Sequence, residues 1–422
     1  NLSLRRYLKF YKTKIIKLVM KKTIKPKPEF LEKMKKLLNS SDFEKYEKII
    51  QEPLLNSIRC NTLKISPEQL KKSLEEKNWK IYQPWKDYPE VMVIEGKFVD
   101  ENDFGVDNKE IIDDNPLKNK NFVPLTNLNK SERGTSEQIS AGGRVGKPLE
   151  ETKNKILVNL GPGELGRSIE HLLGYYYIQE LASMLPPIAL APKSHELILD
   201  LCASPGSKTS QMASQMNNTG TIIANDINIQ RIQILASNLE RCGVTNAIIT
   251  RDDGIRLCEK FNSQKLKFDK ILLDAPCSGE GTMRSSPKTC LMWNPNTIKS
   301  LSKLQKKLFK NAFEILKPNG EIVYSTCTHA PEENEEVVDF ILKEFKDQIE
   351  IEKINLPVKY REGITEWASD FARCNPESKF EKSERGRELD KLYDEKVKLS
   401  CRIYPQDNDT EGFFVAKFRR IK

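Results

Sequence analysis

Between residues 196 and 345, short apolar runs alternate with longer stretches of helical spacing, and this alternation constrains the fold more than any other feature. Strands that alternate with helices along a chain form a parallel sheet with helices on both faces. In such sheets, ligands bind at the edge where the carboxyl ends of the strands meet. The sequence therefore predicts a doubly wound α/β domain, and the runs that mark its strands are ELILDLC, TIIANDI, AIITRDD, KILLDAP and EIVYSTC.

The α/β domain is expected to extend from residue 171 to residue 422. Its mostly parallel, Rossmann-like sheet is predicted to end in an antiparallel C-terminal strand, because the runs SCRIYP and GFFVAKFRR follow the alternating region. The stretch from Leu172 has helical spacing that Pro186 and Pro187 interrupt. The other helices are expected from Ser207, up to Cys242, over 297–316 and over 333–345.

The N-terminal part of the chain predicts a smaller α+β domain over residues 29–99. Helical spacing over 29–50 precedes a strand–helix–strand pattern in which Pro67 lies in the first helical turn. Residues 100–170 are polar and lack sustained periodicity, which predicts a loop or a disordered insert. Residues 1–28 carry ten Lys or Arg and no acid, which favours an arm that contacts RNA phosphates. A packed amphipathic helix, a frayed tail and an organellar presequence remain alternatives for this arm.

Composition limits the compartment and the chemistry of the chain. Hydrophobic residues make up 38% of the 422 residues, and no apolar run approaches the ~18 residues of a membrane span. Nine cysteines without a CxxC pair and only three histidines give no zinc-ligand spacing. A long chain without a secretory signal predicts a reducing, cytoplasmic location. The net charge of +9 favours an anionic partner or reflects a lysine-rich solvated surface. Because the sequence starts at Asn1, the true N-terminus is expected to be missing.

The ends of the first three strands predict an adenosine site. In the turn DLCASPGSKTSQMA, Gly206 precedes a helix that begins at Ser207, and the free N–H groups of a helix start attract a carboxylate. A single glycine excludes both the P-loop and the dinucleotide fingerprint. Asp226 ends the second strand, where it can accept ribose hydroxyls, and Asp253 ends the third, near an adenine edge. A helix N-cap or a solvated loop acid is the alternative for each of these residues. A site of this kind binds an adenosine without a pyrophosphate-binding loop, and S-adenosylmethionine is a ligand that fits it.

Two cysteines, Cys277 and Cys327, follow apolar strands at this same predicted edge, close to Asp274. A buried structural role is usual for cysteine, and we assign that role to Cys60, Cys242, Cys258, Cys290, Cys374 and Cys401. Paired strand-end thiols beside an acid instead favour covalent chemistry on a pyrimidine. A thiolate that adds to carbon 6 makes carbon 5 nucleophilic, and a base then removes the carbon 5 proton. Lys208 and the helix start would lower the pKa of the attacking thiol.

Five motifs resemble those of the Sun-type (Nol/Nop/Sun) RNA cytosine-5 methyltransferases. They are LDLCASPGSKTSQMA, ANDINIQRIQILASNLERCGVTN, DAPCSGEGT, VYSTCTHAPEENEEVV and YPQDNDTEGFFVAKF. The resemblance is close over residues 172–345 and loose over residues 50–100, and the archaeal-type transfer-RNA members are the most similar. It implies a cytoplasmic, monomeric, S-adenosylmethionine-dependent enzyme that methylates RNA, with transfer RNA as the expected substrate and no metal.

The resemblance also implies a role for each site residue. The cysteine of the family's TC motif attacks the ring, which implies Cys327 as nucleophile, and that of the PC motif assists release, which implies Cys277 as base. From the residues themselves, Asp274 is expected to hold the cytosine at nitrogen 3 and its amino group and, if protonated, to share its proton as carbon 6 is attacked. Lys208 is expected to give electrostatic support. The implied methyl-donor site consists of Cys202, Ala203, Ser204, Pro205, Gly206, Ser207, Lys208, Asp226, Arg231, Asp253 and Asp274.

One departure and several rival functions remain open. The family's YPH motif reads YPQ here, with Gln406 in place of the histidine, so any role of that histidine is in doubt. The rivals are a ribosomal-RNA cytosine-5 methyltransferase, a uracil-5 or DNA cytosine methyltransferase, and a catalytically silent RNA-binding assembly factor. The intact pair Cys277 and Cys327 argues against silence, because binding alone requires neither thiol.

Overall fold

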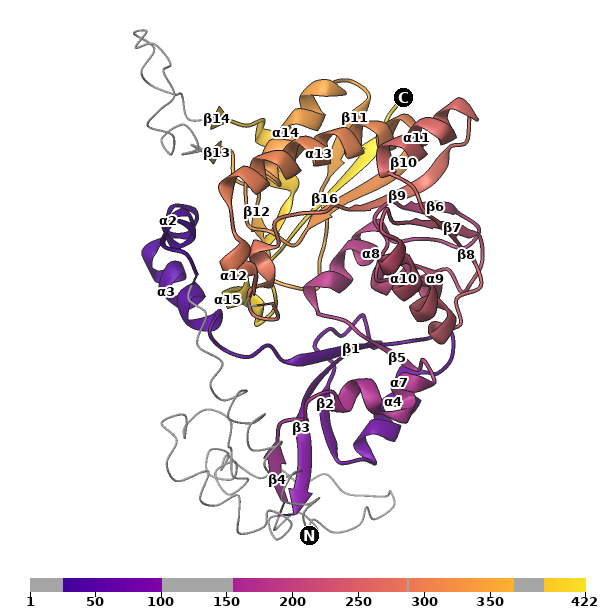
Figure 1. Cartoon of the computed structure of the whole chain (residues 1–422), viewed down its shortest axis with the longest axis vertical. Coiled ribbons are helices and arrows are strands. Elements are labelled where there is room, and N and C mark those ends of the chain that lie inside the picture. The colour runs from indigo at the N-terminus through magenta and orange to yellow at the C-terminus, as the bar shows by residue number, and fades with distance from the viewer. Residues whose placement is uncertain (1–25, 101–154, 287, 368–390) are drawn as a thin grey trace, which may run out of the picture. The chain divides into compact units, whose positions relative to one another are not determined.

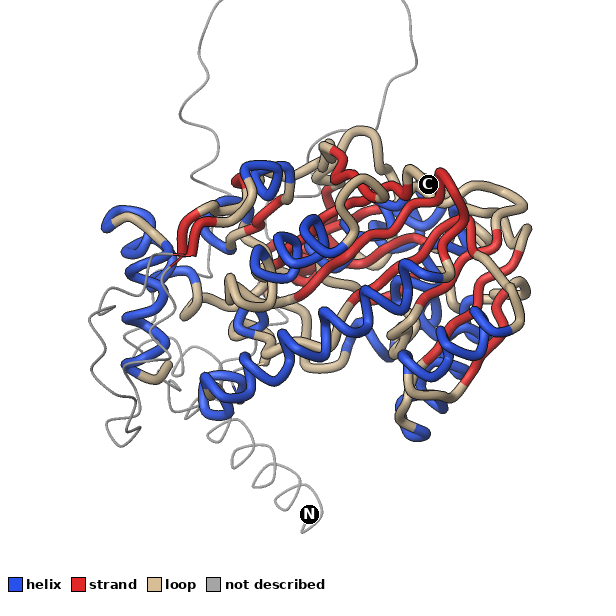
Figure 2. The backbone as a smooth tube through the Cα atoms, turned by 90° about the horizontal axis from the view of Figure 1, so that it is seen from above, coloured by secondary structure: helices blue, strands red, loops and turns tan. Residues whose placement is uncertain are grey.

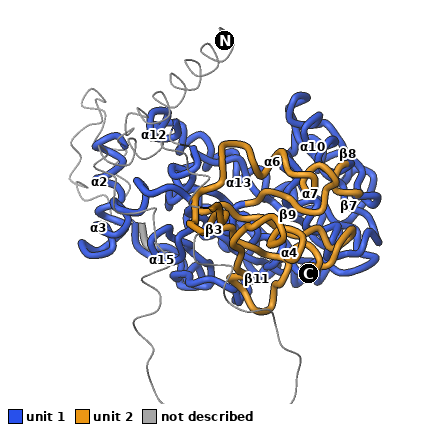
Figure 3. The backbone as a smooth tube through the Cα atoms, turned by 90° about the horizontal axis from the view of Figure 1, so that it is seen from below, with its two compact units in different colours: residues 1–54, 180–240, 244–422 blue, residues 55–179, 241–243 orange. Residues whose placement is uncertain are grey.

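The computed structural model describes residues 26–100, 155–286, 288–367 and 391–422. They form two compact units, which Figure 3 colours separately. Unit 1 comprises residues 1–54, 180–240 and 244–422, and unit 2 comprises residues 55–179 and 241–243. Residues 1–25 of the expected basic arm and residues 101–154 of the expected insert lie outside the described residues.

Unit 1 is built on the predicted sheet, with strand order β12-β15-β16-β10-β9-β6-β7-β8 and with β11 also paired to β16 (Figure 1). The strands from β10 to β8 in this order are parallel, and the pairs formed by β16 are antiparallel, which confirms the predicted fold class. Their bounds are β6 Leu197–Asp200, β7 Thr221–Asn225, β8 Ala247–Thr250, β9 Phe268–Asp274, β10 Leu316–Thr326, β11 Ile349–Glu352, β12 Arg361–Glu362, β15 Cys401–Ile403 and β16 Phe413–Arg420.

Helices cover both faces of this sheet, as Figure 2 shows. One face packs α8 (Leu185–Leu190), α9 (Ser207–Gln215) and α10 (Ile229–Cys242), and the other packs α11 (Gly254–Ser263), α13 (Pro295–Glu314) and α14 (Glu335–Glu344). The main core joins the second group of helices to the sheet, with Phe309, Phe313 and Ile341 almost fully buried against Ile271 and Ile322. Apolar residues at helical spacing therefore face a sheet of apolar runs, as the alternation requires.

The strand order places the carboxyl ends of β9 and β10 side by side. The chain passes outward through β6, β7 and β8 and then returns to place β9 beside β6, so the order reverses between β6 and β9. Strand β10 pairs with β9 in a register that sets Ser325 opposite Asp274. Ligands bind at such a reversal, outside the carboxyl ends of the strands. The residues that follow Asp200, Asp274 and Thr326 therefore converge at one edge.

Unit 2 is an antiparallel sheet of order β2-β3-β1-β5, with β4 also paired to β3, and it carries helix α4. Helix α4 begins where the sequence predicts, because Ser66 accepts the backbone N–H of Gln69 in a capping box and Pro67 fills the first turn. The bounds are β1 Asn56–Cys60, α4 Pro67–Glu75, β2 Trp79–Tyr82, β3 Val91–Asp100, β4 Lys155–Val158, α6 Glu164–Arg167, α7 Ile169–Leu172 and β5 Tyr176–Ile178.

The compact units divide the chain at other positions than the expected domains. The predicted helix over 29–50 is two helices, α2 (Pro28–Leu37) and α3 (Ser40–Ile49), because Asn39 accepts the N–H of Asp42 and starts a new helix. Both helices belong to unit 1, although they were expected in the N-terminal domain. Residues 155–172 were expected within or beside a structureless insert, yet they form β4, α6 and α7 of unit 2.

The helical prediction from Leu172 onward is also wrong in part. Helix α7 ends at that residue, and residues Tyr176–Ile178 form strand β5, which pairs with β1. Pro186 and Pro187 occupy the first turn of α8 and so begin a helix rather than interrupt one. Periodicity alone cannot separate a short buried strand from a helix, and here the pairing with β1 decided the outcome.

Shorter elements complete unit 1. They are η5 Ala182–Met184, η6 Glu280–Thr282, α12 Lys288–Met292, β13 Glu366–Trp367, β14 Lys391–Leu392, η8 Glu395–Leu399 and α15 Pro405–Asn408. Among the residues that the structure describes, no helix has the length and apolar character needed to cross a membrane.

Candidate active site

The thiols of Cys277 and Cys327 meet at the carboxyl edge of the sheet, as the sequence predicts. Cys327 directly follows β10, and Cys277 lies three residues beyond the end of β9. Their sulfur atoms are 3.1 Å apart, and the backbone N–H of Cys327 donates to the Cys277 sulfur at 3.3 Å. The hydrogen bond with Cys327 and burial together raise the pKa of the Cys277 thiol.

A buried lysine and a carboxylate lie beside the thiols. The ammonium of Lys208, on the first turn of α9, is 2.7 Å from Asp274 Oδ2 and 3.1 Å from the hydroxyl of Ser183. Ser325 donates to the other oxygen of Asp274 at 2.8 Å. Burial acts to lower the pKa of Lys208, but the charges of Asp274 and of Cys327 outweigh burial and raise it. Lys208 therefore stays charged where a Cys327 thiolate would form.

The first β-to-α turn has the shape that its sequence predicts. Gly206 precedes α9 with φ +99°, and a Cβ atom there would lie 3.0 Å from Leu235 Cδ1. Only glycine adopts this backbone conformation without strain. Ser204 and Arg231 fix the turn, because the guanidinium donates to the Ser204 carbonyl at 2.7 Å and the hydroxyl donates to the Arg231 carbonyl at 2.8 Å. The N–H groups at the start of α9 are thus held at the edge of the sheet.

The acid that ends the second strand also lies at this edge. Asp226 is 3% exposed, accepts the N–H of Asn228 at 2.9 Å and lies 3.4 Å from the Arg231 guanidinium. Asp253 instead caps α11, since one of its oxygens accepts the N–H groups of Ile255 and Arg256. The structure therefore shows the alternative cap role for Asp253, which leaves its second oxygen for any ligand.

Three acids with shifted pKa values were not singled out by sequence reasoning, and two of them, Asp200 and Glu333, are buried at the site. Burial raises the pKa of Asp200, Glu180 and Glu333 to about 7. Asp200 ends β6, and one of its oxygens has no hydrogen-bond partner among the described residues. Glu333 accepts the N–H of Ser278, the residue after Cys277, at 3.0 Å. The motif PEENE marked Glu333 as part of a family pattern, but only the fold shows that it reaches the Cys277 loop.

Most of the remaining cysteines are more deeply buried than Cys277 and Cys327. Cys60, Cys242, Cys258, Cys290 and Cys401 are free and buried, in keeping with the structural role assigned to them, and Cys374 lies outside the described residues. Cys202 lies in the turn after β6, where burial raises the pKa of its thiol. Within the described ranges, no three His, Cys, Asp or Glu side chains are arranged to hold a metal ion.

The residue at the family's histidine position lies close to a buried aromatic stack. The ring of His329 stacks on Tyr404 with centroids 5.2 Å apart, and burial lowers the pKa of this imidazole to about 3, so it is neutral. Gln406 lies two residues after Tyr404, in α15, and its side-chain amide atoms are buried without a hydrogen-bond partner among the described residues. The structure gives no physical account of these unsatisfied atoms.

Comparison with known proteins identifies relatives that cover both units. A family described as 16S rRNA methyltransferase RsmB/F matches residues 187–419, and one described as the N-terminal domain of 16S rRNA methyltransferase RsmF matches residues 27–88. The tRNA (cytosine(49)-C(5))-methyltransferase of Pyrococcus abyssi is 44% identical over 60% of this chain and 73% of its own length. Ribosomal RNA small subunit methyltransferase F of Aliivibrio salmonicida is 33% identical over 87% of this chain, which spans 58% of that relative.

Two solved structures resemble the whole chain. NSun6 from Pyrococcus horikoshii with SFG aligns with a TM-score of 0.63 and 26% identity, over 94% of this chain and 98% of its own. A methyltransferase homolog protein from the same organism aligns with a TM-score of 0.61 and 28% identity, over 93% and 99% of the two chains.

Proposed function

The chain belongs to the RsmB/F family of RNA methyltransferases, and from this premise we propose that it transfers a methyl group from S-adenosylmethionine to carbon 5 of a cytosine in transfer RNA. The single observation that carries the chemistry is the contact of the Cys277 and Cys327 sulfurs at 3.1 Å, beside Lys208 and Asp274. The relative with 44% identity, named as a transfer-RNA methyltransferase, supports the choice of transfer RNA.

In the proposed mechanism, Cys327 is the nucleophile. Its thiolate bonds to carbon 6 of the cytosine, and the electrons displaced from the ring double bond make carbon 5 nucleophilic. S-adenosylmethionine, when bound, supplies the electrophilic methyl group. The charge of Lys208 stabilises the thiolate before attack, because a nearby opposite charge favours a charged sulfur. Asp274 Oδ2 and Ser325 form a polar edge against which the amino group and nitrogen 3 of the cytosine are held.

Cys277 is the base that releases the product. The bond from Cys327 to carbon 6 removes the charge of that sulfur, so the interaction that raises the pKa of Cys277 is relieved. Cys277 can then ionise and take the proton from carbon 5, after which the bond between carbon 6 and the Cys327 sulfur breaks. The short distance between the two sulfurs allows both steps on one side of the ring.

The residues at the first two strand ends fit the methyl donor. The N-terminus of α9 has no side-chain cap behind Gly206, and it would attract the donor's carboxylate. The Asp226 carboxylate is placed for the ribose hydroxyls, and the unpartnered oxygen of Asp200 faces a buried position at the end of β6. Cys202, Ala203, Pro205 and Ser207 complete the turn, Arg231 donates a hydrogen bond to it, and Asp253 lies beyond the end of β8.

Trapping of the covalent intermediate tests this mechanism. The Cys277→Ala variant, incubated with RNA and the methyl donor, is expected to give a protein–RNA complex that survives a denaturing gel, because it attacks but cannot release. The Cys277→Ala/Cys327→Ala double variant should give none. Methylation by a Cys327→Ala variant at the wild-type rate would overturn the assignment.

A small-subunit ribosomal RNA is the second candidate substrate. It is favoured by the match of residues 27–88 to the N-terminal domain of a 16S rRNA methyltransferase and by ribosomal relatives that cover more of this chain. Purified transfer RNA and 16S rRNA should be offered in equal amounts, with bisulfite sequencing of both. Modification of the ribosomal RNA alone would exclude transfer RNA, and methylation of matched DNA or uracil-only RNA would exclude a cytosine-specific RNA enzyme.

A further inference from the structure

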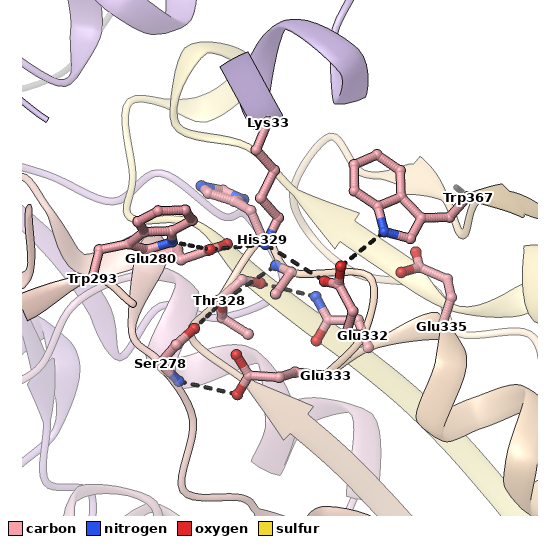
Figure 4. A network of polar contacts seen from close by, with 12 residues as sticks. Lys33, Ser278, Glu280, Trp293, Thr328, His329, Glu332, Glu333, Glu335 and Trp367 are labelled. Atoms are coloured by element: carbon pink, nitrogen blue, oxygen red, sulfur yellow. Dashed lines mark hydrogen bonds and ion pairs between the residues drawn. The ribbon is translucent and has the colours of Figure 1, made fainter. Parts of the chain in front are cut away.

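A buried ion-pair network connects helix α2 to the loops that carry both thiols (Figure 4). The ammonium of Lys33 on α2 lies 2.9 Å from Glu280 Oε1 and 3.5 Å from Glu332 Oε2. Glu280 follows Cys277 by three residues, and Glu332 follows Cys327 by five. Lys33 thus contacts both loops from a helix that lies more than two hundred residues away in the sequence.

Each carboxylate of this network has one further partner. Glu280 Oε1 accepts the indole N–H of Trp293 at 2.6 Å, and Glu332 Oε1 accepts that of Trp367 at 2.9 Å. In Figure 4 the Lys33 side chain descends between the two acids, with one tryptophan on each side. Glu280 is fully buried and Glu332 is 6% exposed, so neither acid has water to solvate its charge.

Lys33 is the cation that favours the ionised form of Glu280. Burial acts to raise the pKa of Glu280, but the charge and hydrogen bond of Lys33 outweigh it and hold that pKa below its usual value. The two glutamates in turn outweigh burial and raise the pKa of Lys33. The neighbouring His329 is neutral, because burial lowers its pKa to about 3. Removal of the lysine would leave two uncompensated carboxylates in the protein interior, which is strongly unfavourable.

Direct bonds also join the two loops to each other. The N–H of Gly281 donates to the Cys327 carbonyl at 2.9 Å, and the hydroxyls of Ser278 and Thr328 lie 2.8 Å apart. Glu280 lies between Ser278 and Gly281, so a shift of its backbone would pull on both of these bonds. The position of Glu280 is therefore coupled to the distance between the two sulfurs.

We propose that Lys33 is a positioning residue that holds the Cys277 loop, and with it the Cys277 thiol, next to Cys327. Release of the methylated RNA is then as fast as covalent attack. This inference rests on the proposed function. Lys33 does not touch the reacting atoms. It acts through Glu280 and the short segment that connects this acid to Cys277.

The two thiols differ in how strongly the sheet holds them. Cys327 directly follows β10, which is paired on both sides, with β9 and with β16, up to its last residues. Cys277 lies outside helix and strand, between the end of β9 and η6. Loss of Lys33 should therefore displace Cys277 more than Cys327. Release should slow more than attack, and a displacement of about 1 Å slows a step by roughly tenfold to a hundredfold.

The test is the steady-state level of covalent protein–RNA complex in Lys33→Met and Lys33→Gln variants during turnover. In both variants the turnover rate is expected to fall by roughly tenfold or more, and the covalent complex is expected to accumulate. A variant with general damage to the fold would instead lose both covalent attack and the complex. Lys33→Arg, which keeps the charge, should restore turnover and abolish the accumulation. Thermal melting of each variant checks that it is folded, and Lys33→Gln serves where Lys33→Met does not fold.

Lys270→Met is the matched control. Lys270 is also buried and lies 3.5 Å from Glu196 and 3.4 Å from Glu321, but it lies toward the opposite end of β9 from Cys277. This variant should lose stability without accumulating the complex. Folded Lys33 variants that lose turnover with no accumulation, or that keep wild-type turnover, would overturn the inference. If Cys277→Ala itself traps no RNA, the proposed function fails instead, whatever the Lys33 variants do.

Discussion

At the scale of single residues, the site is a small set of charges held out of water. Lys208 is 8% exposed and neutralises Asp274, and it stands where a Cys327 thiolate would form. Buried groups of this kind interact strongly, because little solvent screens them. Removal of one partner leaves the other uncompensated, so its effect should be large and specific.

Lys208→Met is expected to lower the rate of methyl transfer by about a hundredfold, because the variant lacks the cation that stabilises the attacking thiolate. Single-turnover methylation of RNA measures this rate. The control is Lys306→Met, which breaks an ion pair of 2.8 Å with Glu336 between α13 and α14. An equal loss in both variants would mean that Lys208 acts only through stability.

Glu333 should make stability depend on pH. Burial raises its folded-state pKa to about 7 from 4.5, so between these values the folded protein binds more protons than the unfolded chain. The contribution of Glu333 to the free energy of unfolding is present at low pH and is lost as the pH rises through about 7. Glu333→Gln, which keeps the acceptor for Ser278, should therefore gain about 2 kcal/mol relative to wild type between pH 5.5 and 8. Urea denaturation at the two pH values measures this, and a constant difference would contradict it.

At the scale of elements, the N-termini of two helices lie at the proposed methyl-donor site. Helices α9 and α11 both begin directly after strands or turns at the carboxyl edge, one behind Gly206 and the other behind Asp253. Each presents N–H groups that have no partner within the helix. In α11 the Asp253 side chain already accepts two of them, whereas the residue before α9 is Gly206, which has no side chain to cap that helix.

Substitution of Asp253 separates its cap role from its proposed ligand role. Asp253→Ala should cost about 1 kcal/mol of stability through loss of the cap, whereas Asp253→Ser keeps a capping oxygen. Both variants should bind S-adenosylmethionine roughly tenfold more weakly in calorimetric titration, since both lack the second carboxylate oxygen. Asn294→Ala removes the cap of α13 and should lower stability with unchanged cofactor affinity. Wild-type affinity in Asp253→Ser would leave Asp253 as a cap alone.

At the scale of the whole molecule, the net charge of +9 favours binding to RNA phosphates. The N-terminal segment is rich in basic residues, since residues 1–25 hold nine of the 69 Lys and Arg and no acid. Binding to phosphates releases counterions, so it appears as a dependence of affinity on salt. Salt titration of RNA affinity can therefore test whether the N-terminal segment contacts phosphates.

Deletion of residues 1–25 is expected to lower the slope of log affinity for RNA against log salt concentration by ~0.7 to 0.9 for each phosphate that the arm no longer neutralises. S-adenosylmethionine affinity should not change, because the residues proposed to bind it lie beyond residue 200. Fluorescence anisotropy with labelled RNA at several salt concentrations measures the slope. An unchanged slope would show that the arm does not bind phosphates.

Local sequence determined much of this protein. Apolar runs bounded by glycine, proline and acids specified the strands, and a capping pattern specified the start of α4. The strand-end positions of Cys277, Cys327, Asp274 and Asp226 followed, because a parallel sheet brings its carboxyl ends to one edge. These features depend on neighbours within about ten residues, so the sequence alone carries them.

Tertiary structure decided what depends on distant partners. Residues 176–178 became a strand because β1 offered an edge, and α2 and α3 joined unit 1 because Phe30 and Tyr46 pack in the same apolar cluster as Trp293 and Tyr404. The contacts of Lys33 with Glu280 and of Glu333 with Ser278 likewise join segments that no local pattern relates. Burial and pairing energies depend on the whole fold, and for this reason the sequence predicted the two thiols but not the lysine proposed to hold them in register.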